Sequence, residues 1–141
     1  MHSDDKWILS TESDIQKAKP DEYVTLARGC HSPEQVKNIK TNKTAGGDLP
    51  ARNDGEAPSE KVAIEYVSFE TMPNVDRQNI PNLKKFNVIE YTTDQNIAKN
   101  FGTRVGSEIV YIKIQKKYLI KGSGVEAGWI SYKNAPVEVK E

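Results

Sequence analysis

Residue types that serve nucleophilic catalysis are scarce in this sequence. Cys30 is its one cysteine, and its two histidines are His2, near the start of the chain, and His31. A Cys-His or Ser-His-Asp arrangement would therefore depend on His31. Its neighbour Cys30 is one position away, and adjacent residues of a strand point to opposite faces of a sheet. We therefore interpret His31 as a loop histidine beside a half-buried thiol.

The sequence also lacks the spacings that mark most metal and phosphate sites. Neither His-Glu-x-x-His nor Cys-x-x-Cys occurs, so we expect no metal, and a lone cysteine excludes an internal disulfide. Glycines gather at 45–48, 101–106 and 121–124, but none of these stretches has the order of a P-loop or of Gly-x-Gly-x-x-Gly. We interpret these glycines as turn residues.

What remains is an arginine, a pair of threonines and a glutamate, in that order, on or beside predicted strands. Arg28 lies on the first strand, Thr92 and Thr93 lie where a later strand leads into a helix, and Glu126 begins a late strand. Each has a plainer explanation by itself. Arg28 could be an exposed charge on an edge strand, the threonines could cap the next helix, and Glu126 could be a solvated carboxylate at a strand end. Together, their order points to a shared site.

Periodicity and capping signals predict the elements that would position these residues. The predicted helices are 10–19, 32–40 and 94–102, and the predicted strands are 22–30, 86–94, 107–115 and pieces of 116–141. Residues 61–70 fit a helix or a strand, because β-branched residues compete there with helical spacing. Residues 41–60, rich in Gly, Asn, Asp and Pro, are predicted to form a long mobile loop. Helices thus come early and strands mostly late, which favours an α+β domain.

Length and charge narrow the class of protein further. The 141 residues fit a single domain, 1–141, with residues 1–20 as an N-terminal helical extension. Twenty basic residues balance twenty acidic ones, which argues weakly against a general nucleic-acid or membrane-surface binder. No apolar run reaches membrane-spanning length, and the N-terminus lacks the order of a signal peptide. We therefore expect a soluble domain without a membrane partner.

Two stretches of the sequence resemble motifs of the mono-ADP-ribosyltransferases of the cholera- and pertussis-toxin-like class. LARGCHSPEQVKNIKTNKTAGGDLPARN (26–53) is similar to their first-strand region, with an arginine, a Pro-containing helix start and a Gly-Gly loop. EYTTDQNIAKNFG (90–102) is similar to their second motif, in which an aromatic residue precedes Ser or Thr. The resemblance covers roughly residues 23–138, and its motifs are short but correctly ordered. It implies a fold of two packed, mostly antiparallel sheets with flanking helices around an NAD cleft.

The resemblance assigns the first motif to NAD binding. Arg28 would hold an NAD phosphate, a task suited to the planar fork of donors on a guanidinium. Gly29 would let the backbone approach and hydrogen-bond the nicotinamide amide. The helix and loop after the second motif, including Phe101 and Arg104, would form a flap over NAD.

The second motif would position the catalytic carboxylate. By resemblance, the hydroxyl of Thr92 orients that carboxylate by a hydrogen bond, and Thr93 supports the corner between strand and helix. Tyr91 would either line the nicotinamide pocket or bury its ring in the core.

The catalytic glutamate is where the sequence departs from the family pattern. Many members carry Glu-x-Glu at the start of the last catalytic strand, and the second glutamate stabilises positive charge on the ribose. If Glu126 is that residue, Gly124 replaces the first glutamate. If Glu126 is the first glutamate, Gly128 replaces the second. We favour the second alignment, because a proline follows the catalytic residue by eight positions in toxin-like members and Pro136 stands at that distance from Gly128.

The resemblance implies an NAD-dependent mono-ADP-ribosyltransferase domain, with NAD as substrate, that is inactive if Gly128 has replaced the catalytic glutamate. We expect it to be delivered as part of a larger toxin, with a target protein in the cytoplasm of the recipient cell and a cognate immunity protein as partner. Two alternatives stay open: a non-catalytic binding or immunity protein, and a metal-independent RNase toxin that uses His31 with Lys116 and Lys117.

Overall fold

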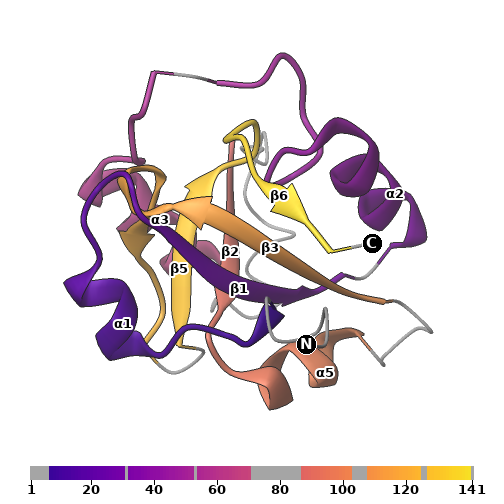
Figure 1. Cartoon of the computed structure of the whole chain (residues 1–141), viewed down its shortest axis with the longest axis horizontal. Helices are drawn as coiled ribbons and strands as arrows, with labels where there is room; N and C mark the ends of the chain where they lie inside the picture. Colours follow the sequence, from indigo (N-terminus) through magenta and orange to yellow (C-terminus); the bar gives the residue numbers. More distant parts are fainter. Residues whose placement is uncertain are drawn as a thin grey trace.

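An antiparallel sheet of six strands, in the order β4-β5-β2-β1-β3-β6, forms the centre of the molecule in a computed structural model of the chain (Figure 1). Its strands are β1 (Tyr23–Gly29), β2 (Val88–Thr92), β3 (Ile109–Gln115), β4 (Ile120–Lys121), β5 (Gly128–Tyr132) and β6 (Glu138–Val139). The structure describes residues 7–30, 32–52, 54–70, 87–102, 108–124 and 127–140.

Helices precede and interrupt the strands, which confirms the predicted α+β class. They are α1 (Glu12–Lys17), α2 (Pro33–Asn42), α3 (Glu60–Glu70), α5 (Gln95–Gly102) and a short 3-10 helix, η2 (Lys116–Tyr118). Thr11 and Asp14 form a capping box at α1, and the Ser32 hydroxyl accepts hydrogen bonds from the first turn of α2. The segment that fitted a helix or a strand, 61–70, is helical.

The sheet consists of two three-stranded halves that meet over a short distance. β1 pairs with β3 along its whole length, and β2 pairs with β5 along its whole length. Between β1 and β2, one register pair, Ala27 with Thr92, joins the halves within the described residues. In Figure 1, β1 and β3 run diagonally while β2 and β5 run nearly vertically, so the halves cross. Two packed sheets were expected, whereas the described strands form one sheet with a narrow join.

The N-terminal segment covers the part of β1 that β2 does not reach. Ser10 forms hydrogen bonds with both main-chain groups of Thr25. Its N–H donates to the Thr25 carbonyl at 3.0 Å, and its hydroxyl accepts from the Thr25 N–H at 2.9 Å. Ile15, the fourth residue of α1, is fully buried. The predicted N-terminal extension is therefore part of the packed domain from about Ser10 onward.

Apolar side chains fill both faces of the sheet, as the alternation along its strands requires. On one face, a large cluster joins the sheet to α1, α2 and the segment after β5; its members include Ile15, Leu26, Ile39, Tyr91, Ile112, Trp129 and Val137. On the other face, α3 packs on β2 and β5 through a smaller cluster of Ala63, Tyr66, Val88 and Ile130. The central strand β2 is thus covered on both sides.

The predicted loop after α2 is held against the segment that follows β5. Lys43 ends α2 in the left-handed conformation, with φ of 55°. The Ala45 N–H then donates to the Ala135 carbonyl at 2.9 Å, and the Arg52 N–H donates to the Asn134 carbonyl at 2.7 Å. These bonds fix the first part of the loop, although it has no regular secondary structure.

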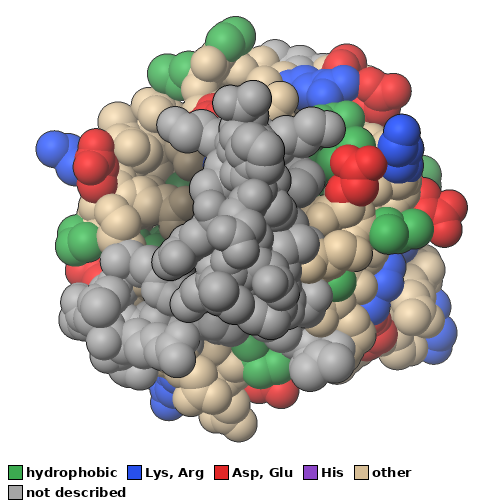
Figure 2. All heavy atoms as spheres, turned by 180° about the vertical axis from the view of Figure 1, so that it is seen from behind, with side chains coloured by type: hydrophobic (Ala, Val, Ile, Leu, Met, Phe, Trp, Pro, Cys, Tyr) green, Lys and Arg blue, Asp and Glu red, His purple; other side chains and the backbone are tan. Residues whose placement is uncertain are grey.

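The described surface carries charges of both signs. In Figure 2, acidic and basic side chains lie next to one another around the rim of the face shown, as the net charge of zero leads one to expect. Among the described helices, none has the length and apolar character needed to cross a membrane.

Candidate functional site

The three strands that carry the predicted motifs are consecutive neighbours in the sheet. β5 pairs with β2 and β2 pairs with β1, so Gly128, Thr92 and Ala27 lie opposite one another across the strands. We call these three residues the register row. Arg28 follows Ala27 directly. Main-chain segments from three distant parts of the sequence therefore meet in the middle of the sheet, with the Thr92 side chain on the face of the register row and the Arg28 side chain on the opposite face.

Arg28 closes the gap between the two halves of the sheet. Alternation along β1 points it to the face opposite Ala27, but its guanidinium reaches β2, where Nη1 donates to the Glu90 carbonyl at 2.9 Å. This bond links β1 to β2 in addition to the register pair of Ala27 and Thr92. Arg28 is half-buried, and its buried Nε has no hydrogen-bond partner within the described part of the chain.

Thr92 and Thr93 form the corner between β2 and α5. The hydroxyl of Thr92 accepts a hydrogen bond from the Asp94 N–H at 3.1 Å, and the Asp94 carboxylate caps the helix by accepting from the Asn96 N–H at 2.8 Å. The Thr93 N–H donates to the Ala127 carbonyl at 3.2 Å. The pair thus caps a helix, and it also ties this corner to the start of β5.

The backbone that enters β5 is strained. Ala127 has φ of 49°, in the left-handed region that costs a residue with a side chain about 1 kcal/mol. The bond from Thr93 to its carbonyl and a long bond of 3.4 Å from its N–H to the Gly124 carbonyl hold it there. Such strain occurs often at ligand-binding and catalytic sites. Ala127 directly precedes Gly128, so it sets the direction in which the chain reaches the register row.

Tyr91 and Gly29 lie inside the sheet. Tyr91 is 2% exposed, and its hydroxyl donates to the Ala45 carbonyl at 2.6 Å. Burial raises the pKa of this phenol, with a smaller contribution from Cys30, so the hydroxyl stays protonated. Of the two roles considered for Tyr91, the structure shows the core position. Gly29 is a buried strand residue opposite Ile109.

A carboxylate that the sequence reasoning missed lies over Gly128. Glu90 shares the face of β2 with Thr92, and its Oε2 accepts a hydrogen bond from the Ser123 N–H at 2.7 Å. A Cβ added to Gly128 would overlap Oε2 and Cδ of Glu90 and come within 2.8 Å of its Cγ. A Cβ added to Gly122 would overlap the same Oε2. We call Gly122 and Gly128 the glycine cradle of Glu90.

One signal in the sequence could have indicated this carboxylate. Glu90 is the single charged residue in the strand VIEYT, and a charge in a buried strand needs a partner. Its partner, however, is the main chain of a loop more than thirty positions away, and local spacing does not reveal which loop that is.

Several predicted site residues fall outside what the structure describes. Glu126 and Arg104 do, and so does the side chain of Phe101. His31 is also outside, so the described residues do not test the RNase alternative, which uses His31 with Lys116 and Lys117.

Cys30 is a buried thiol beside Arg28. It is 0% exposed, and burial raises its pKa, an effect that the nearby Arg28 partly opposes. We predict that Ellman's reagent at pH 8 labels the native protein at least about a hundredfold more slowly than the chain unfolded in urea, because global opening costs ~5 kcal/mol or more. The absorbance of released thionitrobenzoate measures both rates. Equal rates would show that this end of β1 is open in solution.

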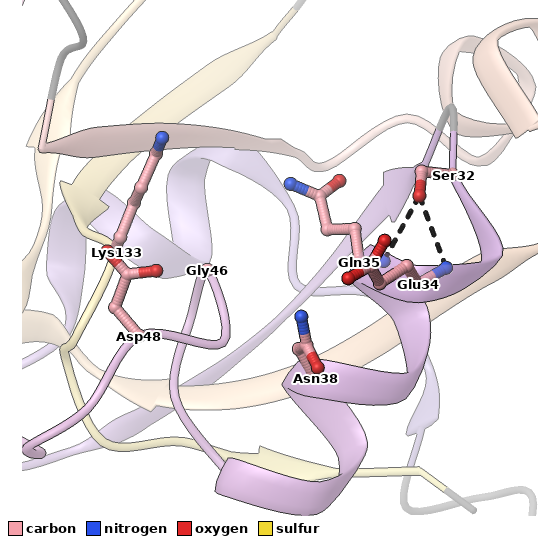
Figure 3. Close-up of a pocket in the computed structure, with 7 residues that line it drawn as sticks. All are labelled: Ser32, Glu34, Gln35, Asn38, Gly46, Asp48 and Lys133. Atoms are coloured by element: carbon pink, nitrogen blue, oxygen red, sulfur yellow. Dashed lines mark hydrogen bonds between the residues drawn. The ribbon is translucent and has the colours of Figure 1, made fainter.

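A polar pocket of about 290 Å³ lies beside the start of α2 (Figure 3). Its lining consists of Ser32, Glu34, Gln35, Asn38, Gly46, Asp48 and Lys133. Figure 3 shows the α2 side chains on one side, with Asp48 and Lys133 on the other. Of the predicted site residues that the structure describes, none lines this pocket. Within the described residues there is no group of three or more His, Cys, Asp or Glu side chains placed to hold a metal ion.

The α+β domain with this register row can be compared with known families. Residues 8–140 match the family described as Domain of unknown function (DUF4765), so the chain belongs to that family over nearly its whole length. No match is found among proteins of curated function. The activity therefore has to be inferred from the site itself.

Proposed function

We propose that the domain is a mono-ADP-ribosyltransferase that cleaves NAD and transfers ADP-ribose to a macromolecular target. The observation that carries the proposal is the register row. It joins the arginine strand, the Thr-Thr corner and the start of β5, the three places that the resemblance assigns to one NAD site. In addition, Ala127 is strained where the chain enters this row.

The reaction breaks the bond between the nicotinamide nitrogen and C1′ of the ribose. Both bonding electrons go to the nitrogen, which neutralises the pyridinium, and positive charge develops on the sugar as an oxocarbenium ion. A nucleophile on the target, or water, then forms the new bond at C1′ and releases its proton. A carboxylate beside the sugar stabilises the developing charge, which is commonly worth several kcal/mol of barrier.

Arg28 suits the binding part of this reaction. Its Nη1 is fixed to the main chain of β2, so the guanidinium is preorganised. In the proposed complex it holds a phosphate of NAD at the join between the sheet halves. Thr92 lies in the register row, next to the place where the carboxylate is needed.

Binding of NAD is the first test. We expect 1 mM NAD to raise the melting temperature of the protein by several degrees, because a ligand at ten times its Kd stabilises the native state by about 1.4 kcal/mol. Arg28→Lys should reduce the shift, since an ammonium cannot reproduce the planar donor pair. Arg52→Lys, a matched change in the loop after α2, should keep it. A native protein whose melting temperature does not respond to NAD would contradict the proposal.

The target and setting follow from the same proposal. We propose that the acceptor is a protein in the cytoplasm of a recipient cell, that the domain is delivered as part of a larger toxin, and that an immunity protein protects the producer. Incubation of the protein with labelled NAD and a cell lysate tests the first point. Label that resists RNase and is lost with protease would identify a protein acceptor.

A further inference from the structure

The carboxylate of Glu90 occupies the space that a side chain at position 128 would need. The three atoms nearest to a Cβ added at Gly128 all belong to the Glu90 side chain. Gly128 is in turn one member of the register row, opposite Thr92. A carboxylate therefore lies at the start of β5 although residue 128 has none.

The surroundings of Glu90 hold this carboxylate in one position. Its Oε2 accepts the Ser123 N–H at 2.7 Å, which is the length of a charge-assisted hydrogen bond. Gly122 and Gly128 face one another across the hairpin of β4 and β5, where the Gly122 N–H donates to the Gly128 carbonyl at 2.9 Å. A side chain on either glycine would displace the carboxylate. The absence of side chains at the glycine cradle therefore leaves the space that the Glu90 side chain fills from β2.

Glu90 lies beside Thr92, one of the residues of the proposed site. It precedes Thr92 by two residues on the same face of β2, while the Arg28 guanidinium reaches the Glu90 carbonyl from the other face of the sheet. Its side chain is half-buried, so it is partly shielded from water but still reached by solvent. Partial burial strengthens the interaction of a carboxylate with a developing positive charge.

We propose that Glu90 supplies the catalytic carboxylate of this domain, in place of a glutamate at position 128. The inference rests on the proposed function. It means that Gly128 does not mark a disabled enzyme. Instead, the glycine makes room for an acid that comes from the neighbouring strand. In the reaction, the Glu90 carboxylate stabilises the positive charge that forms on the ribose as nicotinamide leaves.

The first test removes the charge and keeps the shape. In Glu90→Gln the amide oxygen can still accept the Ser123 N–H, so we expect the fold and the NAD-induced melting shift to persist. The rate of nicotinamide release should fall by about a hundredfold or more, as for other electrostatic deletions in active sites. Glu65→Gln, the same change of charge on the exposed side of α3, should leave the rate unchanged.

The second test moves the carboxylate to the other strand. Glu90→Ala clears the atoms that block position 128, so Glu90→Ala with Gly128→Glu should recover part of the activity that Glu90→Ala loses. Glu90→Ala with Gln16→Glu is the matched control, because it adds the same charge at an exposed position of α1, outside the register row. We expect no recovery there. Circular dichroism checks that each variant is folded.

The outcomes separate this inference from the proposed function. A native protein that neither binds NAD nor releases nicotinamide would overturn both. A native protein that releases nicotinamide, together with a folded Glu90→Gln that is equally active, would overturn the role of Glu90 alone. Loss of activity in Glu126→Gln but not in Glu90→Gln would likewise overturn it, by assigning the catalytic role to Glu126.

Discussion

Gly128→Glu is expected to destabilise the protein and to give no gain in NAD cleavage. The new Cβ would overlap the end of the Glu90 side chain, and the new carboxylate would lie beside the existing one. The Glu90 side chain would have to move away and lose its hydrogen bond from the Ser123 N–H, at a cost of about 1.5–3 kcal/mol of unfolding free energy, and repulsion between the two carboxylates adds to that cost. The substitution that would supply a missing catalytic glutamate is therefore expected to destabilise this protein.

Urea denaturation followed by circular dichroism measures the loss, and nicotinamide release measures the activity. Gly124→Glu is the control, since a Cβ there meets no atom within 4 Å. It should change the unfolding free energy by no more than about 0.5 kcal/mol. A Gly128→Glu protein that is as stable as the native one and more active would show that position 128 is the empty catalytic position.

Trp129→Ala is expected to remove about 3–5 kcal/mol of unfolding free energy, the usual cost of truncating a large buried aromatic residue. Trp129 is 5% exposed and directly follows Gly128. Its indole N–H donates to the Glu12 carboxylate at 3.0 Å, and the ammonium groups of Lys116 and Lys121 lie 5.2 and 5.3 Å from its ring. The substitution thus removes core packing, a hydrogen bond to α1 and two cation-π contacts.

Trp7→Ala is the matched control for Trp129→Ala. Trp7 is half-buried, and one ammonium group, that of Lys113, lies 5.2 Å from its ring. Truncation of Trp7 should lower the unfolding free energy less than truncation of Trp129 does, by about 2 kcal/mol or more. Far-ultraviolet circular dichroism in urea compares the two without relying on tryptophan fluorescence. Equal losses would contradict the buried position of Trp129.

Elements with strong local signals could be predicted from the sequence. The strict alternation in SEIVYIKIQ predicted a strand at 107–115, and β3 covers Ile109–Gln115 with every second residue buried. Ser32 and Pro33 predicted the start of α2, which begins at Pro33. In both cases the information lies within a few neighbouring residues. The segment 61–70 gave conflicting local signals, and packing on β2 and β5 decided for a helix.

Relations between distant strands could not be predicted in the same way. The order of the motifs indicated one site, but the register that places Gly128 opposite Thr92 is a property of pairing across the sheet. The role of Gly128 changed for this reason. As a sequence position it looks like a missing acid, whereas in three dimensions it borders an acid that residue 90 contributes. The narrow join between the sheet halves has no local signal either.

The order of the strands along the chain also determines when the proposed site is complete during synthesis. Arg28 and Glu90 leave the ribosome well before Ser123 and Gly128, which hold the Glu90 carboxylate. A nascent chain that ends before β5 has the arginine, the threonines and the acid, but not the hairpin that fixes the acid in place. The proposed activity therefore depends on the pairing of β5 with β2, and a chain that ends before Gly128 is expected to lack it.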